Sequence, residues 1–328
     1  MRRRGFITLL GATAVAWPLG ARAQQPGLPL IGLLSAESAD RVASQLTAFH
    51  KGLKDGGFVN GQNLTIDYRW AEGHAERLRA MAADLVRRRV AVIVTMATGA
   101  NGIMAARDAA TAIPIVFATG GDPVRLGLVT SVARPGGNLT GVSFFSADLT
   151  AKAMGLLNQI APKARVVGLL FNPNVPDSAR EPADAQEAAR ALGLELLVLN
   201  ASTDPDIEAA FATLLQRGAD ALVIGSDPLF GSRIDRLAAL TQRHRIPAAY
   251  FRREFPDAGG LMSYGTSIVD TYRQVGIYTA RILKGDKPKD LPIILSTKFE
   301  FVLNLKTAKA LGLDVPNSIQ LLADAVIE

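Results

Sequence analysis

Short apolar runs alternate with longer amphipathic stretches along almost the whole chain. Residues 30–34 form the first such run, which breaks into polar residues at Ser35, and residues 90–95 and 113–118 repeat the pattern. An apolar run bounded by turn-forming residues is typical of a strand buried on both faces of a parallel sheet. The stretches between them carry apolar residues at helical spacing. Strands that alternate with helices predict an α/β protein with right-handed crossovers.

The pattern predicts elements that follow the same order in both halves of the chain. Predicted strands cover 30–34, 64–68, 90–95, 113–118, 139–144, 165–171, 195–200, 221–225, 246–250 and 299–303, with a short strand near 261–264. Helices are predicted between most of these strands, including a short one at 126–132 and a long one at 268–283. The halves therefore share one plan of alternating strands and helices.

Glycines at matching places support a duplication. Gly32 and Gly168 each lie inside a predicted strand, and they are 136 positions apart. Gly57 and Gly193 end the helices that follow, and they are also 136 positions apart. A chain of 328 residues is long enough for two domains of about 150 residues each. We predict two Rossmann-like lobes with mainly parallel sheets.

Composition excludes several classes of protein. A hydrophobic content of 48% with 20% charged residues is ordinary for a globular protein. The chain has no cysteine, which excludes disulfides, a thiol nucleophile and a lipid anchor attached through cysteine. The net charge of +6 includes four arginines in the first 23 residues, and about +2 remains without them. A nucleic-acid partner is therefore not expected.

Residues 1–23 have the three parts of a secretory signal. Arg2, Arg3 and Arg4 form the positive start, residues 6–19 the apolar middle, and residues 21–23 (Ala-Arg-Ala) the small-x-small cleavage site. Arg-Arg-Gly-Phe at residues 3–6 also resembles the twin-arginine export signal, with an ordinary Sec signal as the alternative. Either interpretation predicts export, and the twin-arginine one implies a bacterium and a periplasmic location.

Candidate binding residues follow the predicted strands. Ligands of open parallel sheets bind beyond the carboxyl ends of the strands, where helix N-termini favour anions. Ser35 and Thr98 suit a carboxylate on one lobe, and Asp227 on the other could balance an ammonium group. The remaining candidates at strand ends, with glycines for close backbone approach and aromatic rings for apolar cover, are Gly99, Gly121, Asp122, Phe171, Asn172, Tyr250 and Tyr264. The alternative for each is a turn or a helix cap.

Catalytic and metal-binding patterns are absent from the sequence. His50, His74 and His244 are scattered, without metal-ligand spacing. There is no serine elbow, no P-loop and no G-x-G-x-x-G after the first strand. Asp122 and Asp227 each precede a proline, which matching positions of a duplicated fold explain more simply than an acid/base pair. We therefore predict no enzyme, no cofactor and no metal.

Several segments of the chain form a recognisable set. The most specific is the turn Arg-Pro-Gly-Gly-Asn-Leu-Thr-Gly at 134–141, and the others are 31–35, 52–58, 61–66, 120–124 and 304–312. Through these segments the chain resembles the solute-binding proteins of ABC importers, specifically the type I periplasmic-binding family that includes tryptophan- and tyrosine-uptake proteins. The resemblance covers essentially the whole chain after the signal.

This resemblance implies a function and partners. It implies two lobes joined by a multi-strand hinge that the chain crosses three times, so that each lobe is discontinuous in sequence. The N-terminal lobe is then predicted to comprise residues 28–143 plus about 260–292, and the C-terminal lobe 144–259 plus about 293–328. It also implies closure of the lobes on a small organic solute (an amino acid or an aromatic or carboxylate compound), and delivery to an ABC permease and its ATPase. Members are often lipoproteins, so the missing cysteine predicts a freely diffusing protein, expected to be a monomer. A periplasmic sensor for a membrane signalling partner is the alternative. A repressor would need a DNA-binding headpiece where this chain has its signal, and an enzyme lacks its catalytic groups.

Overall fold

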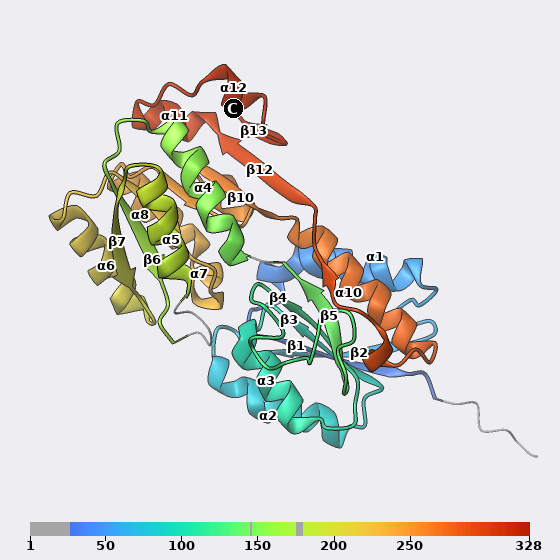
Figure 1. Ribbon diagram of the computed structural model, residues 1–328. Coiled ribbons are helices and arrows are strands. Elements are labelled where there is room, and N and C mark those ends of the chain that lie inside the picture. Colours follow the sequence, from blue (N-terminus) through green and yellow to red (C-terminus); the bar gives the residue numbers. More distant parts are fainter. Residues whose placement is uncertain (1–26, 145, 175–179) are drawn as a thin grey trace, which may run out of the picture.

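Two β-sheets, of six and seven strands, organise the residues described by the computed structural model, which are 27–144, 146–174 and 180–328. Each sheet lies between two layers of helices, so the molecule has two α/β lobes (Figure 1). This confirms the predicted fold class. The predicted signal segment lies outside the described residues.

The N-terminal lobe contains a fully parallel sheet of order β11-β5-β4-β3-β1-β2. Its strands are β1 (Leu30–Ser35), β2 (Thr65–Trp70), β3 (Val92–Met96), β4 (Ile115–Thr119), β5 (Leu139–Ser143) and β11 (Ile294–Leu295). One face packs against α1 (Ala43–Asp55) and α10 (Ile268–Leu283). The other face packs against α2 (Leu78–Arg87) and α3 (Gly99–Ala109). The 3₁₀ turns of this lobe are η1 (Asp40–Val42), η2 (Ala75–Arg77) and η3 (Pro288–Asp290).

The C-terminal lobe contains a sheet of order β13-β12-β10-β9-β8-β6-β7, in which only the β10–β12 pair is antiparallel among the described pairs. Its strands are β6 (Val166–Phe171), β7 (Glu195–Asn200), β8 (Ala221–Ile224), β9 (Ala248–Tyr250), β10 (Met262–Thr266), β12 (Phe299–Asn304) and β13 (Ala325–Ile327). The helices on one face are α4 (Ser146–Ile160), α5 (Arg180–Ala191), α11 (Leu305–Leu311) and α12 (Asn317–Gln320). The helices on the other face are α6 (Asp204–Gln216), α7 (Pro228–Ser232), α8 (Ile234–Arg243) and α9 (Glu254–Asp257).

The internal repeat seen in the sequence is a repeat of topology. The order β2-β1-β3-β4-β5 in one lobe matches β7-β6-β8-β9-β10 in the other. Gly32 on β1 and Gly168 on β6 occupy corresponding places, and a helix crosses each of them closely. A Cβ added at Gly32 would lie 2.9 Å from Leu85 on α2, and one added at Gly168 would lie 3.1 Å from Leu214 on α6. The glycines therefore let a helix pack tightly on the central strand of each lobe.

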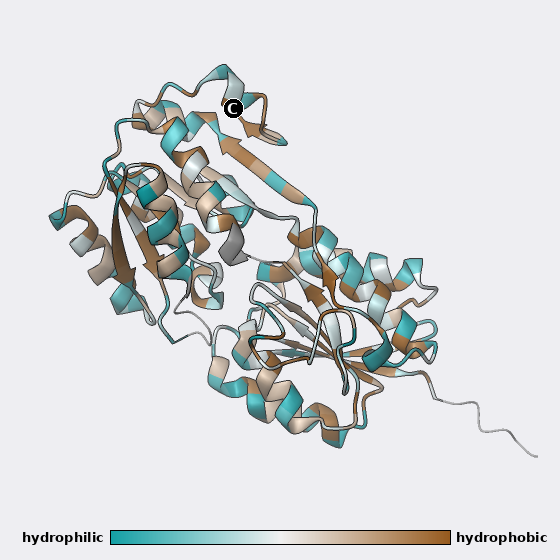
Figure 2. Ribbon diagram, in the orientation of Figure 1, coloured by the Kyte–Doolittle hydropathy of each residue, from teal (hydrophilic) through white to brown (hydrophobic). Residues whose placement is uncertain are grey.

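Burial explains why the strands read as nearly continuous apolar runs. The side chains of β3, β4 and β8 are buried throughout, because helices cover both faces of each sheet. Figure 2 shows hydrophobic strands inside each lobe, with hydrophilic residues along the helices that cover them. Among the described residues, no helix is both long and apolar enough to cross a membrane.

Three connections join the lobes, and two of them lie elsewhere than predicted. The chain crosses from β5 to α4, from β10 to α10, and from β11 to β12. Residues 262–266, predicted in the N-terminal lobe, form β10, which pairs with β9 and β12 of the C-terminal sheet. Residues 294–295, predicted in the C-terminal lobe, form β11, which pairs with β5. Short strands carry no local signal of the sheet they join, so their partners decide the lobe boundaries.

The helix predicted at 126–132 is wrong. The chain there forms successive turns, in which Leu126 N donates to Asp122 O and Leu128 N donates to Pro123 O. Gly127 has φ +64°, in the left-handed region, which interrupts a right-handed helix. The apolar residues Leu126, Leu128 and Val129 are nevertheless buried against the N-terminal sheet.

Candidate functional site

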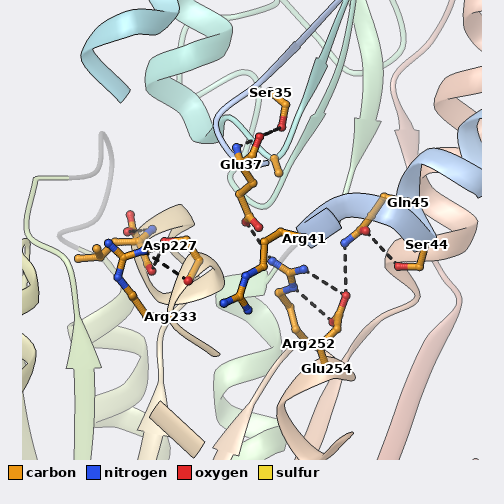
Figure 3. Close-up of polar contacts among 12 residues, drawn as sticks. Ser35, Glu37, Arg41, Ser44, Gln45, Asp227, Arg233, Arg252 and Glu254 are labelled. Atoms are coloured by element: carbon orange, nitrogen blue, oxygen red, sulfur yellow. Dashed lines mark hydrogen bonds and ion pairs between the residues drawn. The ribbon is translucent and has the colours of Figure 1, made fainter. Parts of the chain in front are cut away.

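The carboxyl ends of the strands of both lobes meet in a cleft that is held shut by contacts between the lobes. Glu37, which follows β1, forms an ion pair with Arg252, which follows β9, at 3.1 Å (Figure 3). Both side chains are buried, with 2% and 8% of their surface exposed. Arg252 also binds Glu254 at 3.1 Å, and the side-chain amide of Gln45 in α1 lies against both groups. These residues form one polar network across the cleft.

Further contacts tie the lobes together around this network. Arg41 of η1 forms an exposed ion pair with Asp235 of α8 at 2.8 Å. The rings of Phe144, beside the hinge, and Phe251 are stacked at 6.3 Å. A Cβ added at Gly99 would lie 3.0 Å from Pro228 of the other lobe, so the backbones approach closely there. The structure is therefore a closed arrangement of the two lobes.

Ser35 positions Glu37. Ser35 Oγ accepts a hydrogen bond from Glu37 N at 3.1 Å and donates one to Glu37 O at 3.2 Å, so the loop after β1 turns sharply. The turn directs the Glu37 carboxylate toward Arg252 (Figure 3). The Ser35 side chain thus stabilises this turn in the structure. Glu37 was not among the predicted site residues, although it is an acidic residue just beyond a strand end.

The electrostatics of this network are dominated by burial. Burial raises the pKa of Glu37 and outweighs the opposite influence of Arg252. Burial also acts to raise the pKa of Glu254, but Arg252 outweighs it and leaves that pKa below its usual value. For Arg252, burial lowers the pKa, while the carboxylates of Glu254 and Glu37 raise it further than burial lowers it. Arg252 therefore stays charged, and Glu37 is the group of these three whose charged form is disfavoured by its surroundings.

Two candidates in the N-terminal lobe, Asp122 and Gly121, form hydrogen bonds within their own loop, and two others, Thr98 and Gly99, lie where the lobes meet. Asp122 Oδ1 accepts hydrogen bonds from Val124 N at 2.9 Å and Arg125 N at 3.3 Å, which caps a turn. Gly121 N donates to Thr119 Oγ1 within the same loop. Thr98 is buried at the start of α3, next to Gly99, which contacts Pro228 across the cleft.

Asn172 and Asp227 come together in the C-terminal lobe. The Asn172 side chain hydrogen-bonds Asp227, whose Oδ1 also accepts from Leu229 N at 2.7 Å and so caps α7. Burial raises the pKa of Asp227 despite these bonds. Glu181 of α5 was not among the predicted site residues. Its carboxyl group lies close to Gly225, and burial raises its pKa to about 7. The residue as a whole is only half-buried, but its carboxyl is enclosed.

A mainly apolar pocket lies beside the network in the C-terminal lobe. It is small and partly open to solvent, and its lining includes Leu149, Ala153, Ser226, Tyr250, Phe251 and Tyr264. Tyr250 and Tyr264, two predicted site residues, thus share one pocket. Phe171 is buried in the core on the α4 side of the sheet. The Tyr250 hydroxyl is buried without a hydrogen-bond partner among the described residues.

A two-lobed α/β fold whose strand ends face each other and make contacts between the lobes defines a class of proteins that bind solutes between their lobes. Residues 31–327 match the family described as ABC transporter substrate binding protein. The chain belongs to this family.

Individual relatives agree with this assignment. A Tyrosine-binding protein of Clostridioides difficile (strain R20291) is 25% identical over 291 residues, which cover 88% of this chain and 82% of the relative. A solved ABC domain from Streptococcus pneumonia, in complex with L-Trp, shares 24% identity with a TM-score of 0.83, over 91% of this chain and 99% of the other. A ligand-free, open substrate binding protein with adhesive properties from Clostridium difficile gives 24% identity and a TM-score of 0.67, over 92% and 99%. These confirm the resemblance seen in the sequence.

Proposed function

We propose that this protein is the periplasmic solute-binding component of an ABC importer, which closes its two lobes on an amino acid and delivers it to a membrane permease. The observation that carries the proposal is the closed cleft, where the buried Glu37–Arg252 pair joins the lobes next to the aromatic pocket of Tyr250, Phe251 and Tyr264. Contacts that exist only in the closed form let a solute shift the open–closed equilibrium.

An aromatic amino acid is the solute we propose first. The pocket offers flat aromatic rings to an apolar side chain, and the adjoining polar network offers partners to charged groups. Two relatives support the choice, since one is named a tyrosine-binding protein and the other was solved with L-Trp.

Calorimetry with L-tyrosine and L-tryptophan tests this proposal directly. We expect binding, a higher melting temperature, and a smaller radius of gyration in X-ray scattering if the free protein samples an open form. Mass spectrometry of the solute that copurifies with the protein gives an independent identification. If neither amino acid binds and a different compound copurifies, the proposed solute class is wrong.

Export by the twin-arginine route is part of the proposal. Arg3 and Arg4 followed by Phe6 support it, and the absence of cysteine supports a protein without a cysteine-linked lipid. Replacing both Arg3 and Arg4 by Lys should leave the protein in the cytoplasm, whereas Arg2→Lys should not. Export of the double variant at the normal level would favour the Sec route.

The partner distinguishes uptake from sensing. Crosslinking of the solute-loaded protein in membranes should capture a permease, and loss of the protein should abolish uptake of the radiolabelled solute. Capture of a signalling receptor with normal uptake would favour a periplasmic sensor instead.

A further inference from the structure

The carboxylate of Glu37 has one oxygen that is bonded and one that is not. Oε1 accepts a hydrogen bond from Arg252 Nη1 at 3.1 Å. Oε2 is buried, and none of the described residues gives it a hydrogen bond. Buried polar atoms are almost always satisfied, and an exception in a cleft points to a missing donor. Oε2 of Glu37 is therefore an acceptor that a hydrogen-bond donor of a bound molecule could satisfy.

Arg252 already binds two carboxylates of the protein. Its Nη1 is bound to Glu37, and its Nε and Nη2 are bound to Glu254 at 3.3 and 3.1 Å. These bonds use three of the five N–H donors of the guanidinium. A further anion would lie close to the negative charges of Glu37 and Glu254, which disfavours it at this position.

Asp227 is also less available than the sequence suggested. Its carboxylate accepts hydrogen bonds from Leu229 N and from the Asn172 side chain, and it caps α7. The Glu37 carboxylate by contrast has no hydrogen-bond donor for Oε2 among the described residues, and the charged groups that influence it are Arg252, Glu254 and Arg41. Of the two carboxylates, the one with an unsatisfied oxygen is the better acceptor for a cationic group.

A second polar atom without a partner lies at the end of a strand in the other lobe. Tyr250 is the last residue of β9, and its hydroxyl is buried without a hydrogen-bond partner among the described residues. A solute held at the strand ends of both lobes would therefore meet two such polar groups, Glu37 Oε2 and the Tyr250 hydroxyl.

We propose that Oε2 of Glu37 binds the primary ammonium group of the solute when the lobes close, which makes Glu37 a specificity-determining residue. The proposal rests on the proposed function, because it specifies one group of the amino acid. The same side chain then joins the lobes through Oε1 and binds the ammonium group of the solute through Oε2. A charged hydrogen bond formed only in the closed cleft would couple recognition to closure.

Matched probes with and without the ammonium group test the proposal. L-tyrosine and 3-(4-hydroxyphenyl)propionate share the ring and the carboxylate, and they differ in the amino group. The readout is the ratio of their affinities, measured by calorimetry for wild type, Glu37→Gln and Asp235→Asn. Glu37→Gln keeps an acceptor for Arg252 but puts an amide in place of the second oxygen. Asp235→Asn breaks the exposed Arg41 pair and serves as the control.

We expect wild type to prefer L-tyrosine by about tenfold or more, and Glu37→Gln to lose most of that preference. Weaker closure alone would lower both affinities and leave the ratio unchanged, which is the result expected for Asp235→Asn. Melting temperatures show whether each variant is folded. An unchanged ratio in folded Glu37→Gln overturns this inference and leaves the proposed function standing. A wild-type protein that binds neither probe overturns both.

Discussion

Gly231→Ala should hold the cleft open without harming the lobe that carries it. Gly231 lies in α7, and a Cβ added there would be 2.7 Å from Arg252 Nη1 and 3.0 Å from Glu37 Oε1. Those two atoms form the buried pair that joins the lobes, so the added methyl group displaces at least one of them. Ala favours a helix over Gly by up to about 1 kcal/mol, so the local helix is not weakened.

The size of the effect follows from the contact that is lost. A hydrogen bond between charged groups contributes about 1.5–3 kcal/mol. Loss of this contact would lower the ratio of closed to open protein by about 10- to 100-fold, since each 1.4 kcal/mol is a factor of ten. The apparent affinity for solute should fall by a similar factor if the solute binds the closed form.

Calorimetry and X-ray scattering measure the two consequences. Gly231→Ala should bind the solute more weakly and show a larger radius of gyration than wild type. Gly155→Ala is the matched control, because it places the same methyl group on α4 with no heavy atom within 4 Å. A Gly231→Ala protein that closes and binds like wild type would refute the reasoning that this pair controls closure.

Two other predictions concern stability. The pKa of Glu181 is raised from 4.5 to about 7, so its protonated form is favoured by folding, and the associated stability is lost as the pH rises from about 4.5 through 7. In urea unfolding at pH 8, the free energy of unfolding of Glu181→Gln should therefore exceed that of wild type, by at most about 3 kcal/mol. The difference should vanish near pH 4. Equal free energies of unfolding at pH 8 would contradict the raised pKa. Tyr250→Phe removes a buried hydroxyl without a partner among the described residues, so its melting temperature should equal or exceed that of wild type, and a clear decrease would reveal a missed hydrogen bond.

Much of the fold could be predicted from local patterns. The helix predicted at 268–283 has the observed bounds of α10, and the strand at 195–200 those of β7. The 136-residue spacing of Gly32 and Gly168 indicated two matching lobes, and the strand orders confirm them. Buried parallel strands and amphipathic helices leave strong local signals, because burial of each face selects the residues on it.

The candidate site could be predicted only in outline. That ligands bind at strand ends is a rule of topology, and it led to Tyr250 and Tyr264, which share a pocket. The roles of Asp122 as a turn cap and Asp227 as a helix cap depend on loop geometry that residue type does not reveal. Whether the predicted residues contact solute stays a prediction.

The sequence by itself determined the class of fold, the duplication and the family resemblance, since each depends on patterns of residues that are close together along the chain. Tertiary structure alone decided which sheet β10 and β11 join, because a short strand takes its place from its partners. It also decided the pairing of Glu37 with Arg252, which are 215 positions apart. The sequence around either residue does not indicate its partner, and only the approach of the two lobes buries both charges in one contact.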